Sequence, residues 1–166
     1  GNDELHGGND PSETGGADKH EDIVVYSGAP RGIQITLGLP TVTGQGIDTI
    51  EGFYSVVGSE HDDHITGGAE TDVVRALGGD DKMMVDSAEG EVFGGSGDDE
   101  LHLGFAVYGG KGSDTIQRAV QYADGGPGGD RMIGALKRDN FRGGTGPDLL
   151  RGRGGGDYLD GSKGHN

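Results

Sequence analysis

The sequence predicts an all-β chain: a right-handed parallel β-roll, or β-solenoid, of about 15–18 residues per coil, with a non-repeat β excursion near residues 24–47. Three observations support this fold class. Glycine is far more abundant than in ordinary domains, a short glycine-aspartate pattern recurs along the chain, and apolar residues follow the same spacing. Stacked coils with two short strands each would produce all three.

The composition limits how this chain can fold. Its 166 residues include 38 glycines and only 30% hydrophobic residues. The formal net charge is −16, from 13 basic and 29 acidic residues. Low hydrophobicity with high net charge is typical of chains that stay unfolded unless something compensates. This charge calls for cations and argues against nucleic acid or an anionic membrane as partner.

Four segments fit one nine-residue template, in which glycines hold positions one, two and four, aspartate position six and an apolar residue position eight. These are GGSGDDELH from Gly94, GGKGSDTIQ from Gly109, GGPGGDRMI from Gly125 and GGTGPDLLR from Gly143. Looser copies begin at Gly58, Gly67, Ala76 and Gly152. Fixed internal periodicity of this kind indicates a repeat architecture.

The aspartates at position six give the coil length. The main series is separated by 18, 18, 15, 16 and 18 residues and consists of Asp63, Asp81, Asp99, Asp114, Asp130 and Asp148. Weaker earlier members are Asp48, Asp22 and Asp3, and a second series offset by nine contains Asp72, Asp139 and Asp157. Two turns and two strands per coil would explain both series.

Apolar residues at position eight predict two buried rows, one in each of two parallel sheets. The first row is Ile65, Met83, Leu101, Ile116, Met132 and Leu150; the second is Val74, Val92, Val107, Tyr122, Phe141 and Leu159. Only six residues separate Leu101 from Val107, and about six separate Ile116 from Tyr122. Those second turns are too short for an ion site, so we expect a well-occupied ladder on the Asp99 side and a patchy one opposite.

The chain divides into three regions. Residues 1–22 read as degenerate edge repeats, 23–57 as an irregular β insertion, and 58–166 as the repeat array. Within the insertion, Pro30 and Pro40 bracket IQITLGL, which is predicted as a strand. Both ends break within a repeat, with Asn166 in the aspartate place of the last one. We therefore expect the natural array to continue beyond both ends.

The repeat blocks between Gly94 and Leu159 resemble the RTX (repeats-in-toxin) calcium-binding family, and DTIEGFYSVVGSEHDDHITGG at 48–68 resembles the segments that introduce such blocks. The resemblance implies several bound calcium ions, a secreted, extracellular or cell-surface location, and disorder before secretion. In many relatives a type I exporter carries the unfolded chain, and external calcium then folds it.

The expected ligands are aspartate carboxylates and backbone carbonyls of the turns. Calcium takes six to eight oxygen ligands, so one turn is an incomplete site and a second, stacked turn completes it. Roughly eight ions would neutralise the net charge, and we expect roughly five to eight. The candidate residues are Asp63, Asp81, Asp99, Asp114, Asp130, Asp148, Asp157, Asp72, Asp139 and Asp48, with positions one, three and five of the four turns: Gly94, Ser96, Asp98, Gly109, Lys111, Ser113, Gly125, Pro127, Gly129, Gly143, Thr145 and Pro147.

Other site chemistries are less well supported. The chain has no cysteine, no HExxH motif and no nucleophile elbow, and its glycine loops lack the full P-loop spacing. His61 and His64 in EHDDH are interpreted as turn residues rather than a transition-metal site, and the aromatic residues as sheet core or edge. Basic residues in the last third either balance the acidic turns or form a polyanion-binding face: Arg131, Lys137, Arg138, Arg142, Arg151 and Arg153.

The sequence favours a non-catalytic calcium-binding module of a larger secreted protein. Two alternatives stay open: a structural or adhesive repeat of an extracellular filament or surface layer, and an appendage of a secreted enzyme or toxin whose active site lies outside this chain. The expected partners are calcium ions, with other domains of the parent chain or neighbouring copies. No apolar run reaches the roughly 18 residues of a membrane span.

Overall fold

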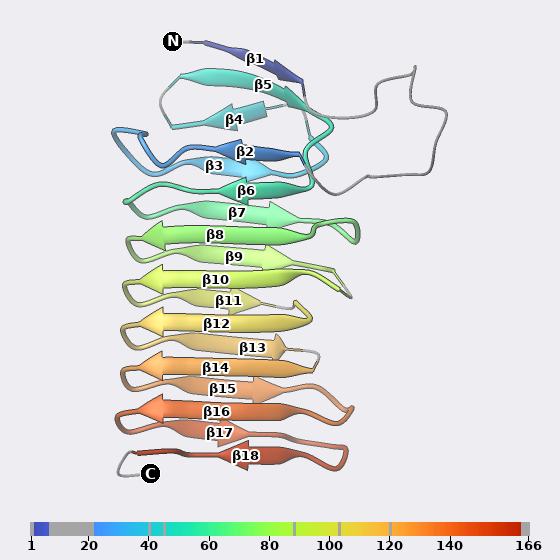
Figure 1. Ribbon diagram of the computed structural model, residues 1–166, viewed down its shortest axis with the longest axis vertical. Coiled ribbons are helices and arrows are strands. Elements are labelled where there is room, and N and C mark those ends of the chain that lie inside the picture. Colours follow the sequence, from blue (N-terminus) through green and yellow to red (C-terminus); the bar gives the residue numbers. More distant parts are fainter. Residues whose placement is uncertain are drawn as a thin grey trace.

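The protein is a stack of flattened coils, seen in a computed structural model that describes residues 2–6, 22–39, 41–44, 46–87, 89–102, 104–119 and 121–163. Successive coils follow one another along the long axis, and each contributes a strand to each of two sheets (Figure 1). The described residues contain only strands, turns and connecting segments, and no helix among them is long and apolar enough to cross a membrane. The predicted all-β parallel solenoid is confirmed.

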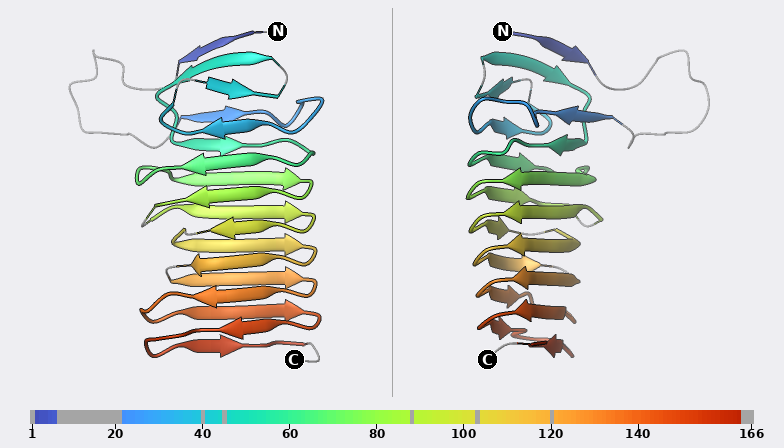
Figure 2. Two further views of the ribbon diagram at one scale, coloured as in Figure 1. Left: turned by 180° about the vertical axis from the view of Figure 1, so that it is seen from behind. Right: turned by 60° about the vertical axis from the view of Figure 1, so that its left-hand side comes forward.

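The two sheets face each other across the core, and Figure 2 shows the same stack from two further directions. One sheet has ten strands among the described residues, in the spatial order β1 (Glu4–His6), β5 (Ile47–Glu51), β4 (Thr41–Thr43), β3 (Gln34–Thr36), β7 (His64–Gly67), β9 (Lys82–Val85), β11 (Glu100–His102), β13 (Thr115–Ala119), β15 (Arg131–Gly134) and β17 (Leu149–Arg151). The other has eight, in the order β18 (Tyr158–Asp160), β16 (Asn140–Thr145), β14 (Tyr122–Pro127), β12 (Ala106–Lys111), β10 (Glu91–Ser96), β8 (Val73–Gly78), β6 (Ser55–Val57) and β2 (Ile23–Val25).

The first apolar row is in the predicted register. Its six members are direct partners in neighbouring parallel strands, from Ile65 opposite Met83 to Met132 opposite Leu150. The members from Ile65 to Met132 are fully buried, and Leu150 packs against them at the end of the row. Side chains alternate between the two faces of a strand, so one row of apolar residues per sheet supplies the core.

The second row differs from the prediction at two members: Tyr122 is not part of it, and Leu159, although in register with Phe141, is 43% exposed. Ala123, and not Tyr122, lies between Val107 and Phe141 in the row. Strand β13 contains one extra residue, Arg118, which has no register partner in β15. The backbone φ of Arg118 is +59°. Seven residues rather than six therefore separate Ile116 from the second row, and a shift of one residue turns a side chain to the opposite face of the sheet. Tyr122 is half-buried on the outer face.

The excursion is smaller than the predicted insertion. Strand β2 pairs in parallel with β6, and β3 pairs in parallel with β7, so residues 23–36 form a coil that stacks on the array. Among the described strands, only β4 departs from the parallel order, because it lies antiparallel to both β3 and β5. Strand β1 then extends the ten-stranded sheet beyond β5. Most of residues 1–22, the region assigned to edge repeats, lies outside the described residues. Asn166, predicted to take the place of the aspartate in the last repeat, also lies outside them.

Candidate metal centre

Two kinds of turn connect the sheets. The Asp99-side turns lead from the eight-stranded sheet to the ten-stranded one; they include residues 94–99, 109–114, 125–130 and 143–148, the four blocks of the template. The opposite-side turns lead back and include residues 67–72, 134–139 and 152–157. All Asp99-side turns lie along one edge of the stack (Figure 1).

A row of aspartates runs along the Asp99 side, each linked to the next coil. The backbone N–H of one aspartate donates to Oδ1 of the next at 2.7–3.0 Å; the row consists of Asp63, Asp81, Asp99, Asp114, Asp130 and Asp148. The row begins at Asp63 and does not include Asp48, because β3 and β4 lie between β5 and β7. Oδ1 of Asp48 instead accepts a hydrogen bond from the backbone N–H of Asp3. The predicted series is therefore brought together, apart from its weaker early members.

The second carboxylate oxygen of this row is the feature that fits a cation. Oδ2 of Asp81, Asp99, Asp114 and Asp130 is buried and has no hydrogen-bond partner among the described residues. A buried carboxylate oxygen left without a donor is costly, so such an atom requires an explanation. The four atoms recur at the same place in successive coils. This regularity points to the same cation bound in each coil rather than to isolated packing defects.

The glycines at position one leave room beside these oxygens. A Cβ atom at Gly94 would lie no farther than 2.6 Å from both Oδ2 of Asp99 and the carbonyl oxygen of Gly109 in the next coil. The same holds one coil further on, for Gly109 with Asp114 and Gly125. Carboxylate and carbonyl oxygens from adjacent coils thus converge where any side chain would interfere. Calcium accepts both kinds of oxygen, so the residues fit this ion.

The glycines at position two have a different function. Gly110 has a φ of +113°, and a Cβ there would collide with the carbonyl oxygen of Gly95 in the preceding coil. Glycine is therefore needed both for the backbone conformation and for the close approach of neighbouring turns. Leu77 and Arg153, at position two of the looser copies that begin at Ala76 and Gly152, keep positive φ values of +89° and +74° with a side chain.

Positions three and five also join neighbouring coils. The carbonyl oxygens at position three accept hydrogen bonds from the preceding coil at 2.8–3.0 Å and belong to Ser96, Lys111, Pro127 and Thr145. A carbonyl oxygen has two lone pairs, so this bond leaves one for a metal. At position five, Asp98 lies at the surface, and its Oδ1 accepts the backbone N–H of Ser113 at 2.6 Å.

Sequence reasoning named Asp98 as a candidate but missed Asp62 and Asp80, which form an outer row of acidic residues with it. Oδ1 of Asp62 accepts the backbone N–H of Asp80, and Oδ1 of Asp80 accepts that of Asp98, both at 2.8 Å. These carboxylates face solvent, in contrast to the buried row beside them. The paired aspartates at 62–63, 80–81 and 98–99 were the sequence signal for it. The described residues contain no cluster of three or more His, Cys, Asp and Glu side chains suited to a metal, so a site here depends on backbone oxygens.

Burial alters the acidity of the inner row. It raises the pKa of Asp81 to about 8, of Asp130 to about 7, and of Asp99 and Asp114 to about 6. The hydrogen bond from the preceding backbone N–H opposes this shift, and neighbouring carboxylates add to it. Without a cation, the folded coils hold carboxylates that resist ionisation. A divalent cation would supply the positive charge that stabilises the ionised form of these carboxylates.

The opposite side repeats the inter-coil hydrogen bond once, but the carboxylate oxygens of Asp139 differ from those of the inner row, since its Oδ2 accepts the backbone N–H of Ala135 at 3.1 Å. The backbone N–H of Asp139 donates to Oδ1 of Asp157 at 3.1 Å, and Oδ1 of Asp139 is buried with no hydrogen-bond partner among the described residues. Burial raises the pKa of Asp139 as well. At the third predicted member, Asp72, the geometry differs: a Cβ at Gly67 would meet the side chain of Thr71 instead of a carboxylate. The short turn between Leu101 and Val107 carries no ladder aspartate, so the opposite row is interrupted as expected.

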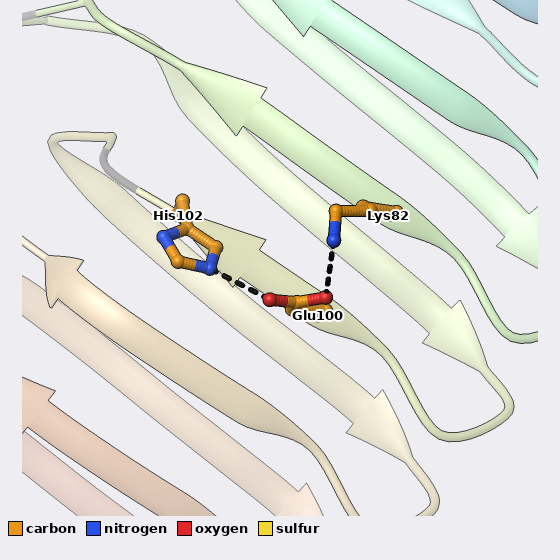
Figure 3. Close-up of polar contacts among 3 residues, drawn as sticks. All are labelled: Lys82, Glu100 and His102. Atoms are coloured by element: carbon orange, nitrogen blue, oxygen red, sulfur yellow. Dashed lines mark hydrogen bonds and ion pairs between the residues drawn. The ribbon is translucent and has the colours of Figure 1, made fainter.

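The outer sheet faces carry ordinary surface contacts. Lys82 Nζ lies 2.7 Å from Glu100 Oε2 on the strand of the adjacent coil, and His102 Nε2, on the same strand as Glu100, lies 3.0 Å from its Oε1 (Figure 3). The hydrogen bond from Lys82 is the main cause that lowers the pKa of Glu100. His61 and His64 are exposed.

Two aromatic rings stack on the eight-stranded sheet, whereas the basic residues of the last third are spread over both sheets and the turns. The rings of Phe93 and Tyr108 stack at 4.8 Å on the outer face of the eight-stranded sheet, whereas Phe141 is buried in the core. Among the six basic residues of the last third, Arg142 alone forms an ion pair within the described part of the chain, with Asp124 at 3.9 Å. Local charge balancing is therefore seen for one of the six.

A family model for the RTX calcium-binding nonapeptide repeat matches residues 56–87, 91–105 and 133–166, in four copies. This array belongs to the RTX calcium-binding repeat family. The matched residues include Asp81 and Asp99 of the four orphaned carboxylates, whereas Asp114 and Asp130 lie between two matched segments of the RTX array. Comparison with curated proteins and with solved structures gives no significant match.

Proposed function

We propose that calcium binding and coil stacking are the same event in this RTX roll. The single observation that carries the proposal is the row of buried Oδ2 atoms of Asp81, Asp99, Asp114 and Asp130, each without a hydrogen-bond donor among the described residues. Each ion would be held between two coils by these carboxylates and by carbonyls of positions one, three and five. A bound ion would supply positive charge and the missing partner for Oδ2.

The number of sites follows from the gaps between aspartates. The Asp99 side has five gaps between Asp63 and Asp148, but both oxygens of Asp63 already accept protein donors, which leaves four gaps from Asp81 onward; the opposite side has one between Asp139 and Asp157. Five calcium ions would carry ten positive charges against a formal charge of −16. The remaining −6 is small enough for an ordinary soluble domain. Metal thus removes most of the self-repulsion that opposes folding.

The biological role we propose is a non-catalytic module of a secreted protein. Within the cell the scarcity of calcium would leave the array unfolded, and millimolar calcium outside would fold it. The argument is thermodynamic: an ion that binds the folded state alone stabilises it in proportion to the logarithm of its concentration. Any catalytic activity of the parent protein would belong to other parts of that protein.

Calcium titration of the full chain followed by far-ultraviolet circular dichroism tests this function. The chain in chelator should gain β structure cooperatively as calcium rises to the millimolar range, and excess chelator should reverse the gain. Magnesium is the matched control, because its strict octahedral geometry suits carbonyl-rich turns poorly. An array that is equally β-structured in chelator and in calcium would overturn the proposal.

A further inference from the structure

Asp63, the first aspartate of the inner row, differs from those that follow. Its Oδ1 accepts hydrogen bonds from the backbone N–H of Ile33 at 2.8 Å and from Ser59 Oγ at 2.7 Å. Its Oδ2 accepts the backbone N–H of Ser59 at 2.7 Å. Protein donors therefore satisfy both oxygens of this buried carboxylate, whereas Asp81 and Asp99 each have an oxygen without a donor.

The turn above Asp63 lacks the features of an ion site. The register places Tyr26 where the other coils have Gly58 or Gly94, and Ile33 where they have an aspartate. Both side chains are buried. A tyrosine and an isoleucine thus replace the glycine and the carboxylate that hold an ion elsewhere, while Ile33 keeps the backbone hydrogen bond to the next coil. The inner row is closed at this end by apolar packing and by Ser59.

The same part of the chain holds a dense apolar core. Ten of the 21 buried residues in the core cluster fall between Val24 and Ile65, a stretch of 42 residues, and the other eleven are spread from Val74 to Phe141. Hydrophobic stabilisation is roughly proportional to buried apolar area. The region with more core residues per length of chain therefore depends least on metal for its stability. Strand β4 adds backbone pairing to both β3 and β5 in this region.

We propose that residues 22–67 form a calcium-independent folding unit that caps the roll, and that Asp63 is a capping residue stabilised by Ser59. This inference rests on the proposed function, since it concerns where the need for calcium begins. Folding would then start from this end: the cap presents β6 and β7 as a template, and each bound ion adds the next coil. Repeat proteins fold by such nearest-neighbour growth, and a preformed end removes the cost of nucleation.

Hydrogen–deuterium exchange of the full chain, resolved by peptide, tests the cap. In chelator, peptides from residues 23–67 should exchange at least about tenfold more slowly than peptides from 91–160, and calcium should slow the second group alone by a large factor. Uniformly fast exchange in chelator with protection everywhere in calcium would overturn the cap but leave the calcium function intact. Exchange that calcium does not alter would overturn the function and not the cap.

Two pairs of variants test the residues. In chelator, Ser59→Ala should speed exchange of residues 33–65 by at least about tenfold through the loss of the hydroxyl donor to Oδ1 of Asp63, whereas Ser113→Ala, in an exposed turn of the array, should leave that region unchanged. In calcium, Asp114→Asn should reduce the number of bound ions measured by equilibrium dialysis, and Asp63→Asn should not. Equal loss of ions in the two variants would show that Asp63 is an ordinary ligand.

Discussion

The backbone N–H of Asp99 donates a 2.9 Å hydrogen bond to Oδ1 of Asp114, fifteen residues further along the chain, and Oδ2 of Asp114 is left buried without a donor among the described residues. One carboxylate thus has two functions: one oxygen aligns two coils and the other is available to a cation. A stacking contact and a ligand position are therefore parts of the same side chain.

Removal of two adjacent carboxylates should weaken calcium-induced folding strongly. The double variant Asp114→Asn, Asp130→Asn leaves two neighbouring sites with less negative charge, and the calcium midpoint should rise by at least about tenfold with lower cooperativity. Asp72→Asn is the matched control, because Thr71 occupies the corresponding place beside Gly67. Titrations followed by circular dichroism measure both variants. Equal effects would contradict a ladder concentrated on the Asp99 side.

A single methyl group at position two should be costly. Gly110→Ala places a Cβ against the carbonyl of Gly95 at a φ of +113°, and should lower the free energy of unfolding of the calcium-loaded protein by about 2 kcal/mol or more. Gly28→Ala is the control, since nothing lies within 4 Å of the new Cβ, and its effect should stay within about 0.5 kcal/mol. Urea unfolding in saturating calcium compares the two. Similar losses in both variants would show that close stacking of turns does not limit stability.

Acid should stabilise the metal-free roll. Burial raises the folded-state pKa of Asp81 to about 8 and of Asp130 to about 7, above the ordinary aspartate value of about 4. Between these values the folded state binds more protons than the unfolded state, so the free energy of unfolding falls as pH rises from about 4 to about 8. In chelator, circular dichroism should show more β structure at pH 5 than at pH 8. The opposite trend would mean that the inner carboxylates are not buried in the metal-free coils.

Calcium binding should also release protons. At pH 5, where acid should keep metal-free coils folded, the raised pKa values of Asp81 and Asp130 leave these groups largely protonated, and calcium binds the ionised form. Calorimetric titrations in buffers of different ionisation enthalpy should show proton release at pH 5 that disappears near pH 9. Release that does not vary with pH would argue against these residues as ligands.

The ion pair between Lys82 and Glu100 should matter little. Both side chains are about half exposed, and exposed pairs contribute at most about 1 kcal/mol. Lys82→Met should therefore change the unfolding free energy of the calcium-loaded protein by less than about 1 kcal/mol, as measured by urea unfolding. A larger loss would show that charges on the outer face, and not the inner row alone, hold adjacent coils together.

Much of this architecture was predictable because the repeat fixes both spacing and orientation. The spacing of Met83, Leu101 and Ile116 predicted the observed register, since position eight of the template always points inward. The extra residue at Arg118 could not be recognised, because no glycine or proline marks it, and Tyr122 was therefore assigned to the wrong face. The stacking of residues 23–36 on the array also escaped prediction. Its turn carries Tyr26 and Ile33 in place of the template residues.

The distinction between Asp63 and the later aspartates required the structure. Sequence spacing treats Asp63 and Asp81 as equivalent, since each stands at position six. Only the donors around the carboxylate separate them: Ser59 and Ile33 satisfy Asp63, while Oδ2 of Asp81 has no donor among the described residues. A serine directly after the position-one glycine was the available signal, but its meaning depends on side-chain geometry.

The most direct test of the shared-ligand account is a crystal structure of the full chain grown in millimolar calcium, with terbium exchanged into a second crystal so that anomalous scattering locates the ions. The account predicts an ion beside Oδ2 of Asp99, of Asp114 and of Asp130, each contacted by oxygens from two successive coils. Ordered, stacked coils with no ion along this row would contradict it.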